Sequence, residues 1–498
     1  MLDFFKSMEV PVTPPRVTPA CACLLAVLAS GHAATAQDNR IVLPFGQLIA
    51  EQSRPSFSII GAGARPAGMG GAFTALADDA AAASFNPAGL ALLVEPEISV
   101  VGSALERTDT YGRFRTLGQP VSYYSDSEIT FDTTNLSFGA ITLPLEVARR
   151  NFCLQLSYHR LIDFTYEGTR EFVGAIPDRG LSGAFAQRIT QSGDIHTYNL
   201  AAAYQLTQRL SLGVNLSWWD GAWQFATSNG VVEPGANELF FTYRQDNEIS
   251  GFNWNAGLLL RYRYLNLGAT YRAAFDADYE SSSEFGANFG VPTISEPEIA
   301  GPLAWPDSWT FGIAIKPLDS WTITADWTRH NWSEMEFHGV GPEKVGTVNF
   351  FDLEPPEFSG TPDLEVWRFG TEYTLFAGRT AIALRAGYFD EPQPQRVPIE
   401  GNEAEYDGYS AGLGIAAGRF RIDIAYQERN GSAVVTQFVD PRILATGQLA
   451  KQTIGEVETT DRRLFVGLLY QFSSRDAIGR AFRFLLVGPA EEPPADAP

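Results

Sequence analysis

The side chains that could perform chemistry are scattered along this sequence of 498 residues and form no catalytic motif. The histidines lack the spacing of metal ligands, and no serine stands in a nucleophile elbow. Beyond the first forty residues the only cysteine is Cys153, so there is no disulfide framework. Gly61, Gly63 and Gly68 approach a dinucleotide fingerprint, but Pro66 takes its third glycine position and no βαβ unit follows. The sequence therefore predicts no enzyme, no cofactor and no metal site. The histidines are His32, His159, His196, His330 and His338.

Charged and amide side chains alternate with apolar ones along much of the chain, so in extended strands they would share one face. By parity the shared face holds Gln155, Asn199, Asn215, Asn253, Arg261, Arg272, Lys316, Asp326, Arg368, Glu372, Arg385, Arg421 and Asp423. Mutual pairing and hydration in a wet lumen explain most of such a face. Cations on it can also attract an anionic ligand head group, more strongly where water is excluded. The candidate head-group contacts are Arg261, Arg272, Lys316, Arg368, Arg385 and Arg421.

Alternating strands must position these side chains. In residues 321–328 the apolar face holds Trp321, Ile323 and Trp327, and residues 309–316, 420–427 and 463–472 divide in the same way. Alternation alone fits a soluble sandwich as well as a membrane barrel.

The lengths of the connections separate these two alternatives. About fourteen segments of roughly 10–18 residues follow residue 95, an even number in the range of outer-membrane barrels. Tight joints near 207–208, 263, 317–319, 377–378 and 418–419 alternate with long polar connections over 108–128, 166–188, 226–239, 277–305, 333–362, 391–405 and 430–455. Short periplasmic turns and long extracellular loops are typical of such barrels. We therefore predict an all-β fold, a transmembrane antiparallel up-and-down β-barrel of about fourteen strands, placed as a multi-pass protein in the bacterial outer membrane.

Residues 61–90 differ from everything that follows them. They are rich in glycine and alanine, and their only charges are Arg65, Asp78 and Asp79. The acidic pair suits the first turn of a short helix, where it interacts favourably with the helix dipole. Asn86 precedes Pro87 and is expected to end that helix. The apolar content favours a folded plug over a flexible linker.

The N-terminus is typical of an exported protein. Residues 20–31 are apolar but too short to span a bilayer, and residues 34–36 are small, which predicts a signal peptide over 1–36. We expect a periplasmic lead-in and the plug over 37–94, the barrel over 95–472, and a C-terminal tail with a Pro/Glu-rich end over 473–498.

Composition and charge exclude other classes of protein. Charged residues make up 19% of the chain, below the roughly 25% of soluble domains, and aromatic residues make up 12%. No run of about 18 apolar residues follows the first forty, which excludes helical membrane spans. A net charge of −22 disfavours a nucleic-acid partner, because phosphates would be repelled.

Three segments carry a resemblance to a known family. Residues 68–91 (GMGGAFTALADDAAAASFNPAGLA) combine an acidic pair, an alanine run and Asn-Pro-Ala. Residues 306–335 contain two consecutive strands, and residues 384–394 (LRAGYFDEPQP) form a strand that ends in an acidic pair and proline. In these segments the chain resembles the FadL-type outer-membrane transporters of long-chain fatty acids and other hydrophobic compounds. The resemblance covers about residues 56–472.

The resemblance implies a hatch inside the barrel lumen and a route for the ligand. Ligand would be captured among extracellular loops, passed to a pocket above the hatch, and released sideways into the membrane through a gap made by an inward-bent strand. The hatch and gate residues are expected to be Gly68, Gly70, Gly71, Asp78, Asp79, Asn86, Pro87 and Ala88.

We therefore expect a monomeric barrel that transports long-chain fatty acids or aromatic hydrocarbons without catalysis. Its partners are the hydrophobic small-molecule ligand and outer-membrane lipid. Two alternatives stay open. One is a barrel that serves protein secretion or surface anchoring, as in the type IX apparatus, where the same hatch pattern occurs. The other is a general diffusion porin, which the conductance of the intact barrel would reveal.

Overall fold

The computed structural model describes residues 62–473, apart from 112–113, 117–121, 124–127, 177–180, 233–238, 288–292, 296–297, 340–345, 352–354, 397–402, 405 and 437–452. The predicted signal peptide, the lead-in over 37–55 and the tail beyond Ser473 lie outside the described residues. No helix within the described ranges is long and apolar enough to cross a membrane.

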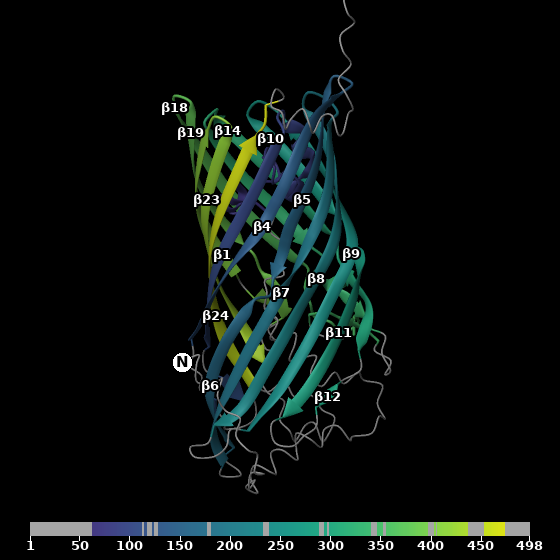
Figure 1. Cartoon of the computed structure of the whole chain (residues 1–498), viewed down its shortest axis with the longest axis vertical. Helices are drawn as coiled ribbons and strands as arrows, with labels where there is room; N and C mark the ends of the chain where they lie inside the picture. Colours follow the sequence, from purple (N-terminus) through teal and green to yellow (C-terminus); the bar gives the residue numbers. More distant parts are fainter. Residues whose placement is uncertain are drawn as a thin grey trace, which may run out of the picture.

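Fourteen antiparallel strands close into a barrel, as the sequence predicts (Figure 1). Closure comes from the pairing of the first strand with the last, from Glu97 opposite Gln471 to Tyr111 opposite Val457. The wall is made by β1 (Glu97–Tyr111), β4 (Glu128–Val147), β5 (Arg150–Asp163), β7 (Leu181–Gln205), β8 (Leu210–Val232), β9 (Leu239–Arg261), β10 (Leu265–Arg272) with β11 (Phe275–Ala287), β13 (Ile299–Trp305) with β14 (Ser308–Leu318), β15 (Trp321–His330), β18 (Leu364–Ala377), β19 (Thr380–Asp390), β22 (Tyr406–Ala417), β23 (Phe420–Thr436) and β24 (Thr453–Gln471).

Shorter elements lie in the connections and ahead of the first strand. The connections contain β2 (Phe114–Thr116), β3 (Ser122–Tyr123), β6 (Tyr166–Ile176), β12 (Ile294–Ser295), η5 (Trp332–Glu334), β16 (Glu336–His338), β17 (Thr347–Asn349), β20 (Gln393–Arg396) and β21 (Glu403–Ala404). Ahead of the first strand, residues 62–94 form α3 (Ala64–Ala67), α4 (Ala82–Phe85) and the 3-10 helix η3 (Pro87–Leu92). This segment, drawn in purple near the top of Figure 1, is the hatch.

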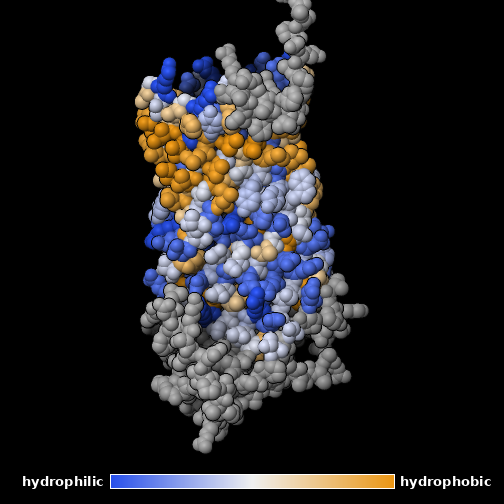
Figure 2. Space-filling model, viewed as in Figure 1, coloured by the Kyte–Doolittle hydropathy of each residue, from blue (hydrophilic) through white to orange (hydrophobic). Residues whose placement is uncertain are grey.

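A band of large apolar side chains faces outward near the end of the barrel that carries the short turns (Figure 2). The residues of the opposite parity are buried, including Asn215, Asp326 and Arg385. Exposed aromatic residues border the band on both sides. Trp218, Phe252, Trp309, Trp367 and Tyr409 lie on one border, and Tyr262, Tyr264, Trp321, Phe376 and Phe420 on the other. Such a band with two aromatic girdles is the lipid-facing surface of an outer-membrane barrel.

The predicted long connections are partly wrong, because the strands continue well beyond the apolar band. The predicted loop 166–188 contains β6 and the start of β7, which pair from Tyr166 opposite Gln191 to Ile176 opposite Leu181. Residues 226–232 of the predicted loop 226–239 belong to β8, and Leu239 begins β9. Outside the membrane both faces of a strand meet water, so the backbone ladder continues after the alternation of hydrophobicity has stopped.

Candidate functional site

The hatch fills the short-turn end of the lumen and is hydrogen-bonded to the wall. Asp326 of β15 accepts bonds from the backbone N–H groups of Phe73 and Thr74, both at 2.8 Å. The N–H of Gly70 donates to Ser410 Oγ of β22 at 2.8 Å. Strands on several sides of the barrel therefore hold the predicted hatch in place.

Asn86 joins the helices of the hatch to each other and to the wall. Its side-chain nitrogen donates to the carbonyls of Thr74 at 2.9 Å and Leu258 of β9 at 3.1 Å, while its oxygen accepts from Ala88 N at 3.1 Å. Its extended backbone ends α4 at Phe85, as expected for a residue before Pro87. The predicted turn 86–88 is thus a buried, fully bonded corner.

The acidic pair does not start the helix that the sequence predicts around residues 80–83. Helix α4 begins at Ala82 and has no acidic residue in its first turn. Asp79 instead accepts a bond from Ala81 N at 2.9 Å and an ion pair from Arg421 at 2.6 Å. Asp78 pairs with Arg65 at 2.5 Å. Arginine side chains attract the pair more strongly than the dipole of a short helix does.

Glycines of the wall make room for the hatch backbone. A Cβ atom added at Gly213 would lie 2.3 Å from Pro87 C, at Gly257 2.1 Å from Asn86 Oδ1, and at Gly387 2.2 Å from Gly70 N. Glycine is therefore required at these positions for steric reasons. On the hatch side, the predicted gate glycines serve the same approach. Gly68 lies against Gly412, and Gly70 and Gly71 have φ values of +64° and +80°.

Buried ion pairs form a closed ring between the hatch and three strands. Arg65 bonds Glu372 of β18 through two nitrogens, each at 2.8 Å. Glu372 bonds Arg385 of β19 at 2.6 Å, and Arg385 bonds Asp423 of β23 at 2.8 Å. Arg421 and Asp79 complete the ring. Arg421 pairs with Asp423 and with Asp79, each at 2.6 Å. Asp79 in turn pairs with Arg65 at 3.4 Å. We call these six residues the hatch ring.

Both hatch members of the ring keep their charge. Burial disfavours the charged guanidinium of Arg65, but Asp78 and Glu372 outweigh it and raise its pKa well above the usual value. Burial also disfavours the carboxylate of Asp79, yet Arg421 and then Arg65 lower its pKa below the usual 3.8. Arg65 and Asp79 are therefore ionised at neutral pH and fasten the hatch electrostatically.

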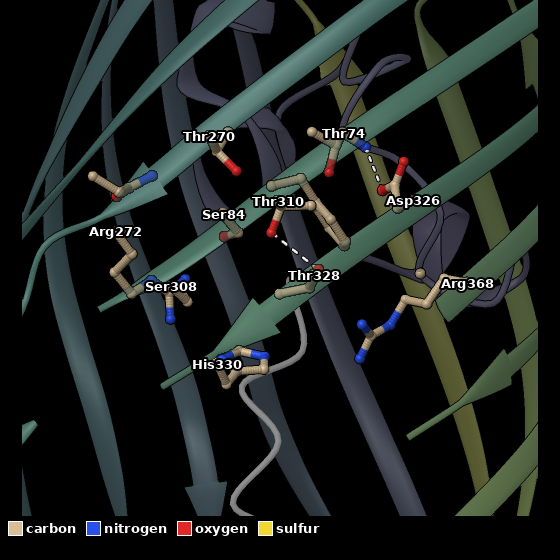
Figure 3. Close-up of a pocket in the computed structure, with 13 residues that line it drawn as sticks. Thr74, Ser84, Thr270, Arg272, Ser308, Thr310, Asp326, Thr328, His330 and Arg368 are labelled. Atoms are coloured by element: carbon tan, nitrogen blue, oxygen red, sulfur yellow. Dashed lines mark hydrogen bonds between the residues drawn. The ribbon is translucent and has the colours of Figure 1, made fainter. Parts of the chain in front are cut away.

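A polar cavity lies between the hatch and the barrel wall (Figure 3). Gly71, Thr74, Ser84 and Phe85 of the hatch form one side of it. The other side consists of wall residues, namely Asn255, Thr270, Arg272, Ser308, Thr310, Asp326, Thr328, His330 and Arg368. The cavity measures about 70 Å³, below the roughly 300 Å³ of a small-molecule site. A ligand that enters it must therefore move the hatch or the surrounding side chains.

The six candidate head-group cations occupy three separate places. Arg272 and Arg368 line the cavity. Arg385 and Arg421 belong to the hatch ring, where carboxylates satisfy them. Arg261 and Lys316 lie at the rim of the barrel, away from the cavity.

Within the cavity the two arginines differ in their bonding. Arg368 donates to Glu391 Oε1 at 3.1 Å, whereas Arg272 has no hydrogen-bond or ion-pair partner among the described residues. Arg272 is therefore the cavity cation with donors to spare for a ligand.

An aromatic cluster occupies the lumen on the far side of the cavity from the hatch. It consists of Ile162, Phe164, Ile195, Trp219, Trp223, Ile249, Ala277, Tyr279, Leu303, Trp305, Trp332, Met335, Phe337, Val348 and Leu364. The ring of His330, a cavity residue, stacks on Trp332 at 5.4 Å, so the two regions adjoin. Trp219, Trp223 and Trp305 of this cluster are buried. Trp218 and Trp254 face outward, with exposed fractions of 47% and 40%.

The ladder between β4 and β5 is interrupted at the level where the apolar band ends. Pairing runs from Val147 opposite Arg150 to Phe138 opposite His159 and stops there, although β4 continues to Glu128. Farther out, Phe131 contacts Tyr166 of β6, with ring centroids 4.9 Å apart. We call the stretch between these two contacts the wall interruption.

The end of β5 bends inward beside the wall interruption. Its register shifts between Arg160 and Ile162, opposite His196 and Ile195 of β7. Just beyond the paired residues, Phe164 N donates to the carbonyl of Gly193, which has a φ of +117°. Phe164 then stacks on Trp223 of the aromatic cluster, with centroids 4.5 Å apart. One side-chain hydrogen bond crosses the interruption, from Asn135 to Asp163.

Comparison with known proteins agrees with this architecture. No curated protein matches the sequence. A solved FadL homologue from Pseudomonas aeruginosa is 12% identical, with a TM-score of 0.60 over 85% of this chain and 100% of that one. The toluene transporter TodX from P. putida is 15% identical, with a TM-score of 0.54 over 83% of this chain and 99% of that one. The family described as outer membrane protein transport protein (OMPP1/FadL/TodX) matches residues 182–457. The chain therefore belongs to this outer-membrane family.

Proposed function

We propose that the protein carries amphipathic hydrophobic acids, such as long-chain fatty acids, across the outer membrane. The observation that supports this most is the continuity of three regions: the aromatic cluster, the hatch, and between them the cavity with Arg272, which has no partner among the described residues. An apolar chain gains about 0.8 kcal/mol for each CH₂ buried among aromatic side chains. A carboxylate gains charge-assisted bonds from Arg272. The proposal involves no chemical step.

A neutral aromatic hydrocarbon is the second candidate. The aromatic cluster favours it, since Trp219, Trp223 and Trp305 offer ring faces that need no charged head group. The family contains the toluene transporter TodX, named above. The two candidates differ in one respect, because only the acid needs Arg272.

We further propose that ligand leaves sideways through the wall interruption between β4 and β5. Its inner side borders Phe164 and the aromatic cluster, and Leu136 and Leu156 are exposed at 51% and 61% on the outer side. A sideways exit keeps an apolar chain out of water. Passage past the hatch would instead expose the chain to the hydrated periplasm.

Arg272→Gln tests the choice of ligand. We expect it to weaken oleate binding to the purified full-length protein roughly 10- to 100-fold, since a bond to a charged group contributes about 1.5–3 kcal/mol. Binding of toluene, measured in the same titration calorimeter, is expected to stay within about twofold. Arg261→Gln removes the same charge from the rim of the barrel and is the matched control.

The outcomes separate the candidate functions. Equal oleate binding by wild type and Arg272→Gln would refute the head-group role. Toluene binding without oleate binding would favour the hydrocarbon. Binding of neither, together with large secretion subunits that purify with the native protein, would favour the secretion alternative.

A further inference from the structure

A cluster of cations lies at the rim of the barrel that carries the short turns. It comprises Arg209, Arg261, Arg263 and Lys316 with Tyr262 and Tyr264, around an open groove of about 640 Å³. We call it the rim cluster. Backbone bonds hold its segments together, from Arg261 N to Arg209 O at 2.7 Å and from Lys316 N to Tyr264 O at 2.9 Å. Short turns mark the periplasmic end of an outer-membrane barrel, so the rim cluster faces the periplasmic leaflet.

The rim cluster brings four positive charges together. No aspartate or glutamate lines the groove, and within the described residues none of the four cations forms an ion pair. The guanidinium groups of Arg209 and Arg263 lie over Tyr262 and Tyr264, at 5.2 and 5.0 Å from the ring centroids. The chain as a whole has a net charge of −22, which makes four gathered cations unusual. A bound anion would reduce the mutual repulsion of these cations.

The apolar band of the membrane surface begins beside the rim cluster. Leu258, Leu267 and Ile315 face outward on the same strands and are exposed at 40%, 39% and 45%. Tyr262 and Tyr264, exposed at 46% and 52%, are in the position where tyrosine prefers the boundary between lipid and water. An anion bound here can therefore carry apolar chains that lie along the band.

We propose that the rim cluster binds the phosphate of an anionic phospholipid in the periplasmic leaflet. Arginine forks match phosphate oxygens in two-bond geometry, and lysine adds a point charge. The acyl chains of the lipid lie against Leu258, Leu267 and Ile315. The site is independent of ligand transport, because it lies away from Arg272 and the cavity.

Native mass spectrometry of the full-length protein tests the lipid site. The probe is phosphatidylglycerol in detergent micelles, with phosphatidylcholine as the zwitterionic comparison and inorganic phosphate as the free anion. We expect the triple variant Arg209→Gln, Arg263→Gln and Lys316→Gln to weaken phosphatidylglycerol binding about 100-fold, because each cation near an anionic surface contributes roughly fivefold. Oleate binding is expected to be unchanged in this variant, so the transport proposal and the lipid proposal fail separately.

A matched control removes charge from other turns at the same end of the barrel. Arg149 and Arg379 are exposed turn residues outside the rim cluster. Their double change to Gln is expected to leave phosphatidylglycerol binding within twofold. The mobility of the unboiled barrel on a gel confirms that each variant is folded.

Four results would overturn the proposal. The first is equal binding of phosphatidylglycerol by the triple variant and wild type, and the second is an equal loss of this binding in the Arg149 and Arg379 control. The third and fourth are binding of phosphatidylcholine, or of inorganic phosphate at the same concentration, by wild type with the same affinity as phosphatidylglycerol. A fifth concerns the acidic residues Glu491, Glu492 and Asp496. If wild type binds phosphatidylglycerol only after these are changed to Gln or Asn, the tail and not a lipid occupies the groove.

Discussion

Arg65 places a buried guanidinium between the hatch and the wall. It is 8% exposed and bonds Glu372 through two nitrogens while also reaching Asp78 and Asp79. A buried ion pair contributes little beyond a well-packed apolar pair, yet removing one partner leaves the other buried and uncompensated. The hatch ring therefore makes hatch position sensitive to single substitutions.

We predict that Arg65→Met loosens the hatch. Loss of the guanidinium leaves Asp78 and Asp79 short of a partner and costs roughly 3 kcal/mol of docking free energy. Openings in planar bilayers are expected to become more than tenfold more frequent. Arg107→Met is the matched control, because Arg107 is equally buried but pairs with Asp461, outside the hatch ring. Equal channel activity in wild type and Arg65→Met would contradict a latch role.

Protonation of Asp79 at low pH is also expected to loosen the hatch. Its pKa is lowered in the folded protein, so its contribution to hatch docking is complete above the usual pKa of 3.8 and is lost as the pH falls through the folded-state pKa. We predict that the contribution of Asp79 to hatch docking is constant from about pH 7 to pH 4, and that channel openings caused by its protonation increase below that range. In Asp79→Asn the low-pH rise is expected to disappear against a higher baseline. A rise centred near neutral pH would exclude Asp79 as its cause.

At this scale the sequence predicts which face a side chain takes but not which partner it finds. Parity places Arg272, Arg368, Arg385 and Arg421 inside the barrel. Their different roles depend on pairing between strands distant in sequence, and Arg385 meets Asp423 across 38 positions. No local pattern encodes such a contact. That Arg272 has no partner in the described part of the chain is therefore visible only in three dimensions.

Among the elements, β5 departs most from regular barrel geometry. It leaves β4 after His159, shifts register on β7, and continues into a hairpin formed by β6 and β7. Gly193, at φ of +117°, allows the local bend on the neighbouring strand. The sequence predicts residues 166–188 as a loop because the segment is polar, although β6 and β7 pair within it. The inward bend expected from the family resemblance is a property of pairing and leaves no local signal.

Bridging the wall interruption is predicted to block transport. In a Cys153→Ser background, Asn135→Cys with Asp163→Cys places two thiols across it, since their parent side chains share a hydrogen bond. A short bis-methanethiosulfonate, which bridges the two thiols through disulfides, is expected to reduce oleate uptake by cells more than tenfold. Dithiothreitol is expected to reduce these disulfides and restore uptake.

The control for this experiment is a cysteine pair in closed wall. Asn430 and Thr460 oppose each other on β23 and β24, where their side chains are 3.0 Å apart. Bridging that pair is expected to leave uptake unchanged. Full uptake after verified cross-linking of the first pair would show that ligand leaves by another route.

For the whole molecule, the sequence predicts the architecture better than the site. Alternation, segregated loop lengths and the glycine-rich segment suffice for a fourteen-strand barrel with an internal hatch, because each is a repeated or local property. The aromatic cluster is different. It gathers Phe164, Trp223, Trp305 and Trp332 from separate strands and connections, so it becomes apparent only when the barrel is closed.

The wall glycines that contact the hatch determine which groups line the lumen once the hatch has moved away. Gly213 faces Gly257, Gly268 faces Gly312, and Gly370 faces Gly387 in the strand registers. When the hatch moves away, these positions present bare peptide groups with no side chains to cover them, and water must solvate them. Opening therefore wets the periplasmic half of the lumen and makes it a poor solvent for an apolar chain. On the sideways route proposed above, these solvated positions act as a hydration barrier that returns an apolar ligand to the lipid.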